Sequence, residues 1–501
     1  MEQVAWDELL HRMGELRDFA GVVGLLTWDQ ETFMPAGSAG GRAAQLAAMQ
    51  ALVHERTIDP RLGELLAAAA AEAGLDETRA AMVRNLSRER ERAVRVPAAL
   101  VRDLAETQSR AVEAWRSARA GQSFATFQPH LERLVELRRA QADAIGHDSE
   151  RYDALLEGHE PGMRVARLEP LFDRLEKALV PIVGALTEVR DARGWNYGDL
   201  RFPVEPQWEF TLYLLREMGF DLQRGRQDRS THPFTDAIHV DDVRLTTRLT
   251  EENPFQAFFS TIHEGGHGLY EQNLPKDLAR TPVGAAASMG LHESQSRLWE
   301  NMIGRSLPFW RRHLPELRRL FPAQLEGVSA EALHAAVNRV ERSPIRTDAD
   351  EVTYNLHILL RFRLELAMLR GDLAVRDLPG AWNEGMRKGL GITPKNDREG
   401  VLQDIHWAWA EFGYFPTYTL GNLYAAILHR AIDRDLGGIE RVVQDGRLAQ
   451  VRDWLARHVH GVGHRWDAEE IVFRATGEPL DAEPFLAYVR AKYGALYGVT
   501  L

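Results

Sequence analysis

Over most of this chain, apolar residues recur at the spacing of an α-helix. The clearest run extends from Leu168 to Leu186, where leucine, isoleucine and phenylalanine side chains lie three or four positions apart. That period places them on one face of a helix, and this face must be buried against neighbouring elements. The segment 64–145 is rich in Ala, Glu, Arg and Leu, which are strong helix formers. The sequence therefore predicts a mainly helical, all-α fold.

One short segment departs from this period. Between Ala237 and Leu249 apolar and polar residues alternate, and several of them are β-branched. Period two is typical of a strand, so we expect a short strand or hairpin here, with a turn or bulge at Asp241–Asp242. No long Gly/Ser or Pro linker interrupts the chain. We therefore expect residues 1–501 to form one domain, with two helical lobes around a cleft.

Charge and cysteine content exclude several function classes. The 61 Lys and Arg against 73 Asp and Glu give a net charge of −12, which argues against a nucleic-acid partner. The absence of cysteine excludes disulfides, a catalytic thiol and thiolate metal sites. We find no secretory signal and no run of about 18 apolar residues. The expected compartment is the cytoplasm, with no membrane partner.

The strongest chemical signal is the segment His263-Glu264-Gly265-Gly266-His267. Positions i and i+4 share one face of a helix, so both imidazoles can reach one metal ion. Glu264 lies beside them, where its carboxylate could activate a water molecule. Each of the two glycines costs about 1 kcal/mol relative to alanine inside a helix. Their presence predicts that substrate or a second backbone approaches this helix closely.

A catalytic zinc site needs a third protein ligand and one open position. Glu293, 26 residues after His267, is the best candidate, because the intervening residues contain the Pro, Gly and small residues needed to turn back. Glu271 and Glu300 are alternatives, and His292 is a weaker one. Zinc would lower the pKa of water towards about 7, and Glu264 would take its proton and pass it to the leaving amine. Peptide hydrolysis is the natural reaction class.

Several motifs give the chain a family resemblance, and they occur in the same order as in that family. Together they resemble the carboxypeptidase Taq family of metallocarboxypeptidases. The matching segments are HPF at 232–234, DxRxT at 242–246, HExxH at 263–267, HESQ at 292–295, IRxxAD at 345–350 and GxxQDxHW at 400–407.

The resemblance implies an enzyme that removes C-terminal amino acids with broad specificity and disfavours proline. It implies Zn²⁺, or Co²⁺ in some members, held by His263, His267 and Glu293, with Glu264 as general acid and base. It also implies a mainly helical fold similar to the neurolysin and angiotensin-converting-enzyme group. A small sheet would lie beside a deep groove, and the enzyme would be a homodimer.

A carboxypeptidase must also hold the free α-carboxylate of its substrate. Arginine suits this task, because its planar guanidinium can bond both carboxylate oxygens. Arg346, in the IRxxAD segment, is the first candidate, and Arg244, on the predicted strand, is the second. The resemblance adds that both segments, together with the one that contains His232, shape specificity and substrate length.

The oxyanion that forms during hydrolysis needs a donor besides the metal. His406, Tyr414 and Tyr418 are the candidates, within one short run of the chain. Tyr418 could also contact substrate. Asp350 and Asp404 could orient a metal-binding histidine through its other ring nitrogen.

The sequence thus favours a zinc-dependent metallocarboxypeptidase that acts on peptides with a free C-terminus. One alternative is an oligoendopeptidase of the same helical group, which would need no clamp for a terminal carboxylate. Another is a non-catalytic helical peptide-binding protein with a structural metal. The intact Glu264 argues against the latter, because a closed structural site does not use a general base.

Overall fold

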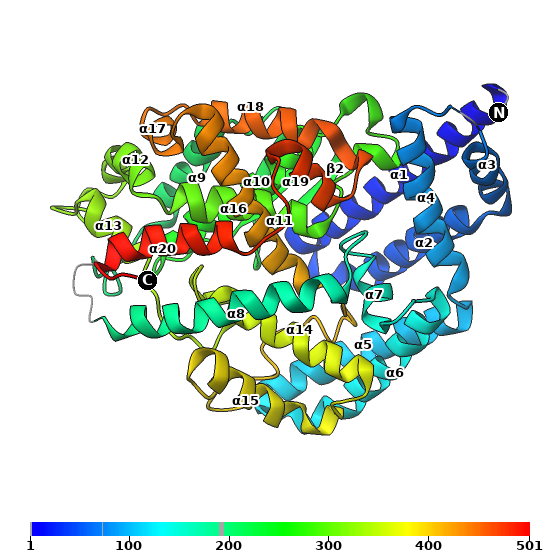
Figure 1. Ribbon diagram of the computed structural model, residues 1–501, viewed down its shortest axis with the longest axis horizontal. Coiled ribbons are helices and arrows are strands. Elements are labelled where there is room, and N and C mark those ends of the chain that lie inside the picture. Colours follow the sequence, from blue (N-terminus) through cyan, green and yellow to red (C-terminus); the bar gives the residue numbers. More distant parts are fainter. Residues whose placement is uncertain (1–2, 73, 190–194) are drawn as a thin grey trace.

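The computed structural model describes residues 3–72, 74–189 and 195–501, and confirms the mainly helical fold with a small three-stranded sheet (Figure 1). No helix within the described residues is both long and apolar enough to cross a membrane. The helices that precede the sheet are α1 (Gln3–Thr32), α2 (Ala39–Ile58), α3 (Pro60–Ala70), α4 (Glu77–Arg95), α5 (Ala98–Gly121), α6 (Gln128–Ile145), α7 (Arg151–Leu156), α8 (Val165–Glu188) and α9 (Val204–Met218).

The helices that follow the sheet include a π-helix, η5, which continues directly from α11. They are α10 (Pro254–Gln272), α11 (Met289–Arg297), η5 (Leu298–Gly304), α12 (Leu307–Leu320), α13 (Ala330–Val337), α14 (Tyr354–Arg370), α15 (Leu378–Leu390), α16 (Pro416–Leu436), α17 (Ile439–Gln444), α18 (Leu448–His458), α19 (Ala468–Thr476) and α20 (Glu483–Tyr497).

The sheet consists of β1 (Gly225–Arg229), β2 (Thr235–His239) and β3 (Asp242–Thr247), in the order β1-β3-β2. Strand β3 pairs antiparallel with β2 and parallel with β1. The predicted hairpin is therefore confirmed, with its turn immediately before Asp242 and a register shift between Ala237 and His239. Strand β1 was not predicted, because its Arg and Asp residues conceal any apolar alternation.

Helix α10 lies at the centre of the fold and packs against α9, α11 and strand β3. Its aromatic residues Phe255, Phe258 and Phe259 are buried and form part of the main apolar core. This face follows the helical spacing of the sequence and anchors the helix through its first turns. The last turns of α10, together with α11, are thereby held in fixed positions.

A second, smaller apolar cluster lies at the N-terminal end of the chain. It brings together Trp6 and Leu9 of α1, Leu65 of α3 and Met82 of α4. Figure 1 shows these helices at one end of the molecule, beyond the central helices that carry the main core. Helix α1 then runs on to pack against strand β2.

Candidate metal centre

Two neighbouring helices bring the three predicted metal ligands together. His263 and His267 lie on α10 and Glu293 lies on α11. The Nε2 atoms of the two histidines lie 3.5 and 3.3 Å from Oε2 of Glu293. One ligand atom from each of the three residues lies within 4.8 Å of the others. This spacing allows one ion to contact all three.

Glycines permit the two helices to approach closely enough for this geometry. A Cβ atom on Gly266 would lie 2.7 Å from the backbone of Gln295 and Ser296 on α11. On the other side of α11, a Cβ atom on Gly421 of α16 would lie 2.6 Å from Cγ of Glu293. Gly266 thus serves the close approach of a second backbone, one of the two reasons that the sequence suggested, whereas Gly265 lies against the side chains of Met218 and Leu215 on α9.

The second ring nitrogen of each histidine has its own partner. Nδ1 of His263 lies 2.9 Å from Oε2 of Glu300, which belongs to the π-helix η5. Nδ1 of His267 is hydrogen-bonded to Nδ1 of His292, and Nε2 of His292 lies 2.7 Å from Oε1 of Glu271. The alternative ligands Glu300, Glu271 and His292 therefore lie behind the predicted ligands and orient them.

The orienting role considered for Asp350 and Asp404 is contradicted. Asp404 binds two arginines, and Asp350 accepts hydrogen bonds from the backbone amides of Glu341 and Thr353. Both carboxylates are already fully engaged in these contacts.

Glu293 is held as a carboxylate. Nε of Arg297 donates to its Oε1 at 2.7 Å, and Oγ of Ser296 donates to its Oε2 at 3.0 Å. Burial alone would raise the pKa of Glu293, but the Arg297 guanidinium and the two nearby histidines hold it well below its ordinary value. An ionised carboxylate is the form that binds a metal ion.

Glu264 is buried beside the ligands, and Thr235 of strand β2 fixes its side chain. Oγ1 of Thr235 donates to Oε2 of Glu264 at 2.7 Å and also lies 3.1 Å from the backbone carbonyl of the same residue. Burial raises the pKa of Glu264 above its ordinary value. Thr235 was missed by the sequence analysis, although it directly follows the HPF segment. The sheet thus contributes one residue to the site.

A second cluster contains Arg346 and its partners. Nε and Nη2 of Arg346 donate to Oδ1 of Asp404 at 2.9 and 2.7 Å, and Nη1 donates to the hydroxyl of Tyr354 at 2.9 Å. Nε of Arg361 donates to Oδ2 of the same aspartate at 2.6 Å. The guanidinium of Arg297 lies over the Tyr354 ring at 4.3 Å, which connects this cluster to Glu293.

His406, Tyr414 and Tyr418 lie together next to Arg346. Nε2 of His406 lies 3.1 Å from the Tyr418 hydroxyl, and the Arg346 guanidinium lies 5.1 Å from the Tyr418 ring centroid. Burial lowers the pKa of His406 to about 3, so its ring is neutral near pH 7. Burial and then the charge of Glu293 raise the pKa of Tyr414, which therefore keeps its proton.

The match to known proteins covers nearly the whole chain. Residues 8–493 match the carboxypeptidase Taq (M32) metallopeptidase family. The chain belongs to this family. It is 44% identical to thermostable carboxypeptidase 1 of Thermus thermophilus, with 99% of each chain covered. It is 35% identical to carboxypeptidase 1 of Bacillus subtilis, with 98% of each chain covered.

A solved structure agrees with these relatives. The M32 carboxypeptidase from Deinococcus radiodurans R1 superposes with a TM-score of 0.96 at 40% identity, covering 99% of this chain and all of that one. The chain is accordingly a metallocarboxypeptidase, and the family resemblance found in the sequence is confirmed.

A carboxypeptidase Taq metallopeptidase uses a divalent metal, and the residues present fit one. Two imidazole nitrogens and one carboxylate oxygen form the donor set of catalytic His₂Glu zinc sites. In both histidines the ring nitrogen that would face away from a bound ion has a partner, as such sites require.

Two other predicted residues of the carboxypeptidase lie on or beside the sheet. Arg244, on β3, makes a two-point ion pair with Asp242 and lies 4.4 Å from the Trp28 ring centroid. His232 is exposed in the segment between β1 and β2. Within the described residues, neither side chain contacts His263, His267 or Glu293.

Proposed function

We propose that this metallocarboxypeptidase binds zinc through His263, His267 and Glu293 and releases single C-terminal residues from peptides, with broad specificity and proline disfavoured. The observation that carries the proposal is the convergence of these three ligand atoms beside the buried carboxyl of Glu264. A bound divalent ion supplies Lewis acidity, which polarises the scissile carbonyl and lowers the pKa of water. Cobalt suits the same donors.

Glu264 acts as the general base and then as the general acid. Thr235 occupies Oε2 of Glu264, so Oε1 remains for the attacking water. The carboxylate takes a proton from this water and later delivers it to the nitrogen of the departing amino acid. Burial raises its pKa, which brings its proton affinity closer to that needed near neutral pH.

Arg346 holds the terminal carboxylate of the substrate. A guanidinium has five N–H groups, and three of those of Arg346 are used by Asp404 and Tyr354. Two guanidinium groups, of Arg346 and Arg361, surround the single carboxylate of Asp404, so the cluster keeps one net positive charge. That charge attracts a carboxylate into this part of the site.

Donors for the oxyanion come from the neighbouring aromatic cluster. His406 and Tyr414 are neutral near pH 7 and can donate hydrogen bonds as negative charge develops on the carbonyl oxygen. Tyr418 positions His406 through the hydrogen bond between them and contacts the substrate. Arg244 and His232 act further out, on the sheet, where they contact longer peptides. We further expect a cytoplasmic homodimer.

Mass spectrometry of peptide products tests this proposal. An N-acylated peptide with a free C-terminus should give a ladder that loses one residue at a time, and a chelator should stop the reaction. The same peptide with an amidated C-terminus is the matched control and should be cut far more slowly. Internal cuts in both peptides would instead indicate an oligoendopeptidase. Elemental analysis of the purified protein should find zinc at one ion per chain.

A further inference from the structure

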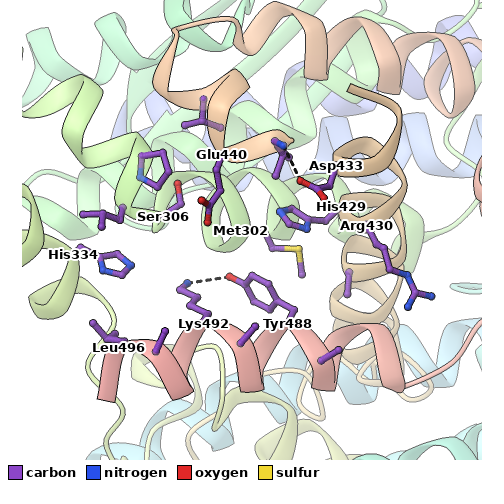
Figure 2. A pocket seen from close by; sticks show the side chains of 18 of the residues that line it. Met302, Ser306, His334, His429, Arg430, Asp433, Glu440, Tyr488, Lys492 and Leu496 are labelled. Carbon is purple, nitrogen blue, oxygen red and sulfur yellow. Dashed lines mark hydrogen bonds between the residues drawn. The ribbon is translucent and has the colours of Figure 1, made fainter. Parts of the chain in front are cut away.

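A cavity of about 860 Å³ lies away from the metal centre, between helices α12, α13, α16, α17 and α20 (Figure 2). None of its lining residues is a proposed ligand or catalytic residue. Most of them are apolar, and the exposed side chains of Ala487, Ala491 and Ala495 leave space along α20. A cavity of this size and character can enclose a small organic molecule.

The charges of the lining residues do not cancel. Arg430 is paired with Glu478, Lys492 with the buried Glu351 and Glu331 with Arg311, so each of these charges is balanced by its own partner. Asp433 and Glu440 make no ion pair within the described residues, and Figure 2 shows both beside the space that the cavity occupies. The lining is therefore complementary to a positive charge.

His429 adds a hydrogen-bond acceptor between these carboxylates and Tyr488. Its ring lies 5.8 Å from the Tyr488 ring and makes no hydrogen bond within the described residues. Burial lowers the pKa of His429 to about 4, so the imidazole is neutral near pH 7 and can accept an N–H.

We propose that this cavity binds a small organic cation, an ammonium group on an apolar body, and that its occupancy is coupled to the metal centre through the π-helix η5. The ammonium group contacts Asp433 and Glu440, and the apolar body lies along the alanines of α20 and against Met302.

The path from the cavity to the metal centre is short. Tyr488 and Lys492 line the cavity, and both donate to the backbone carbonyl of Asn301, at 3.1 and 3.2 Å. Asn301 directly follows Glu300, whose carboxylate holds the metal-binding His263. A ligand that moves Tyr488 or Lys492 therefore acts on the segment of η5 that orients a metal ligand.

Calorimetric titration of the metal-loaded full chain with 4-phenylbutylamine tests the binding site. The neutral 4-phenylbutanol and the anionic 4-phenylbutyrate have the same apolar body and serve as probe controls. We expect the amine to bind at least about tenfold more tightly than the alcohol, because a charge-assisted contact is lost in the alcohol. Equal affinities for the amine and the alcohol would overturn the proposal.

Two variants locate the bound amine. The double substitution Asp433→Asn and Glu440→Gln keeps the side-chain shapes and should weaken amine binding by about tenfold or more. Ala491→Trp should fill the cavity and abolish binding. Glu113→Gln, at an exposed site on α5, is the matched control and should change nothing. Binding that survives in Ala491→Trp would place the amine elsewhere and refute the site.

Sedimentation velocity of the same samples distinguishes another occupant. If a second copy of the chain covers this face, Ala491→Trp should dissociate the dimer, and the wild-type chain should bind no amine. That result would refute the ligand site and show that this face is an interface between two copies of the chain.

The coupling is tested by repeating the titration on metal-free protein. Linkage requires that the metal change the amine's dissociation constant by the same factor by which the amine changes that of the metal. We expect the amine's dissociation constant to differ by at least about threefold between the metal-loaded and metal-free protein. The metal's dissociation constant should change by the same factor when the amine is present. Identical amine affinities with and without metal would refute the coupling. Neither measurement uses peptide hydrolysis, so failure here is separate from failure of the proposed function.

Discussion

At the scale of single residues, the two histidines proposed as metal ligands have different supporting partners. His263 is held directly by the Glu300 carboxylate, whereas His267 is held by a second imidazole that is itself bound to Glu271. A metal bound at Nε2 of His267 would need the lone pair of that atom, which would leave the proton on Nδ1. Nδ1 of His292 must then accept, and its Nε2–H donates to Glu271. With a metal on Nε2 of His267, this arrangement of protons satisfies all three groups.

Replacing His292 should therefore weaken metal binding without removing a ligand. His292→Phe keeps a ring of similar size but leaves Nδ1 of His267 without its acceptor. Loss of such a partner typically costs 10–100-fold in metal affinity. Competition with a chromophoric chelator would measure the dissociation constant, with His11→Gln at an exposed site as control. An unchanged constant would show that His292 does not position the ligand.

Replacing Glu264 should reduce catalysis without weakening metal binding. Glu264→Gln preserves the hydrogen bond from Thr235 but cannot take a proton from water. We expect kcat to fall by about 10²–10⁴-fold, the range for loss of a general base, while the metal content stays at that of the wild type. Steady-state kinetics and elemental analysis on the same preparation would check both. A variant that keeps its activity would assign the base to another residue.

At the scale of secondary-structure elements, the sequence predicted the elements that have a regular local pattern of residues. The HExxH helix and the strand or hairpin expected between Ala237 and Leu249 have regular periods, and Glu293 lies at a spacing that lets a second helix return. Strand β1 was missed because it is held by backbone pairing with β3 and not by apolar alternation. Thr235 and the role of His292 were missed because each depends on contacts between elements that are more than 20 residues apart.

The close packing of α10 on α11 gives a prediction at this scale. Gly266→Ala would place Cβ 2.7 Å from the α11 backbone, so the helices must separate, at a cost of about 1–3 kcal/mol or more from overpacking. In α8, a Cβ on Gly184 would meet nothing within 4 Å. Gly184→Ala should therefore raise the free energy of unfolding by about 0.5–1 kcal/mol. Thermal unfolding of both variants measures this contrast. Equal melting temperatures would contradict the packing argument.

At the scale of the whole molecule, one buried carboxyl joins segments that are distant in sequence. Glu365, on α14, accepts hydrogen bonds from the Tyr152 hydroxyl at 2.8 Å, from Nε1 of Trp407 at 2.9 Å and from the backbone amide of Gly413 at 3.2 Å. Gly413 precedes Tyr414, a proposed oxyanion donor. The interior of α14 thus fixes the position of a loop at the active site.

This carboxyl should make stability depend on pH. Burial raises the pKa of Glu365 from 4.5 to about 8, so between these values the folded chain keeps a proton that the unfolded chain releases. The free energy of unfolding should then fall as pH rises through this window, by up to about 1.4 kcal/mol per pH unit, and level off above pH 8. Glu365→Gln removes this contribution, so its melting temperature relative to the wild type should rise from pH 5.5 to pH 8. The control Glu188→Gln changes an exposed position at the end of α8. Its melting temperature should change with pH as that of the wild type does. If the melting temperature of Glu365→Gln also follows that of the wild type across this pH range, Glu365 is ionised in the folded chain and the loop is held by a charged group.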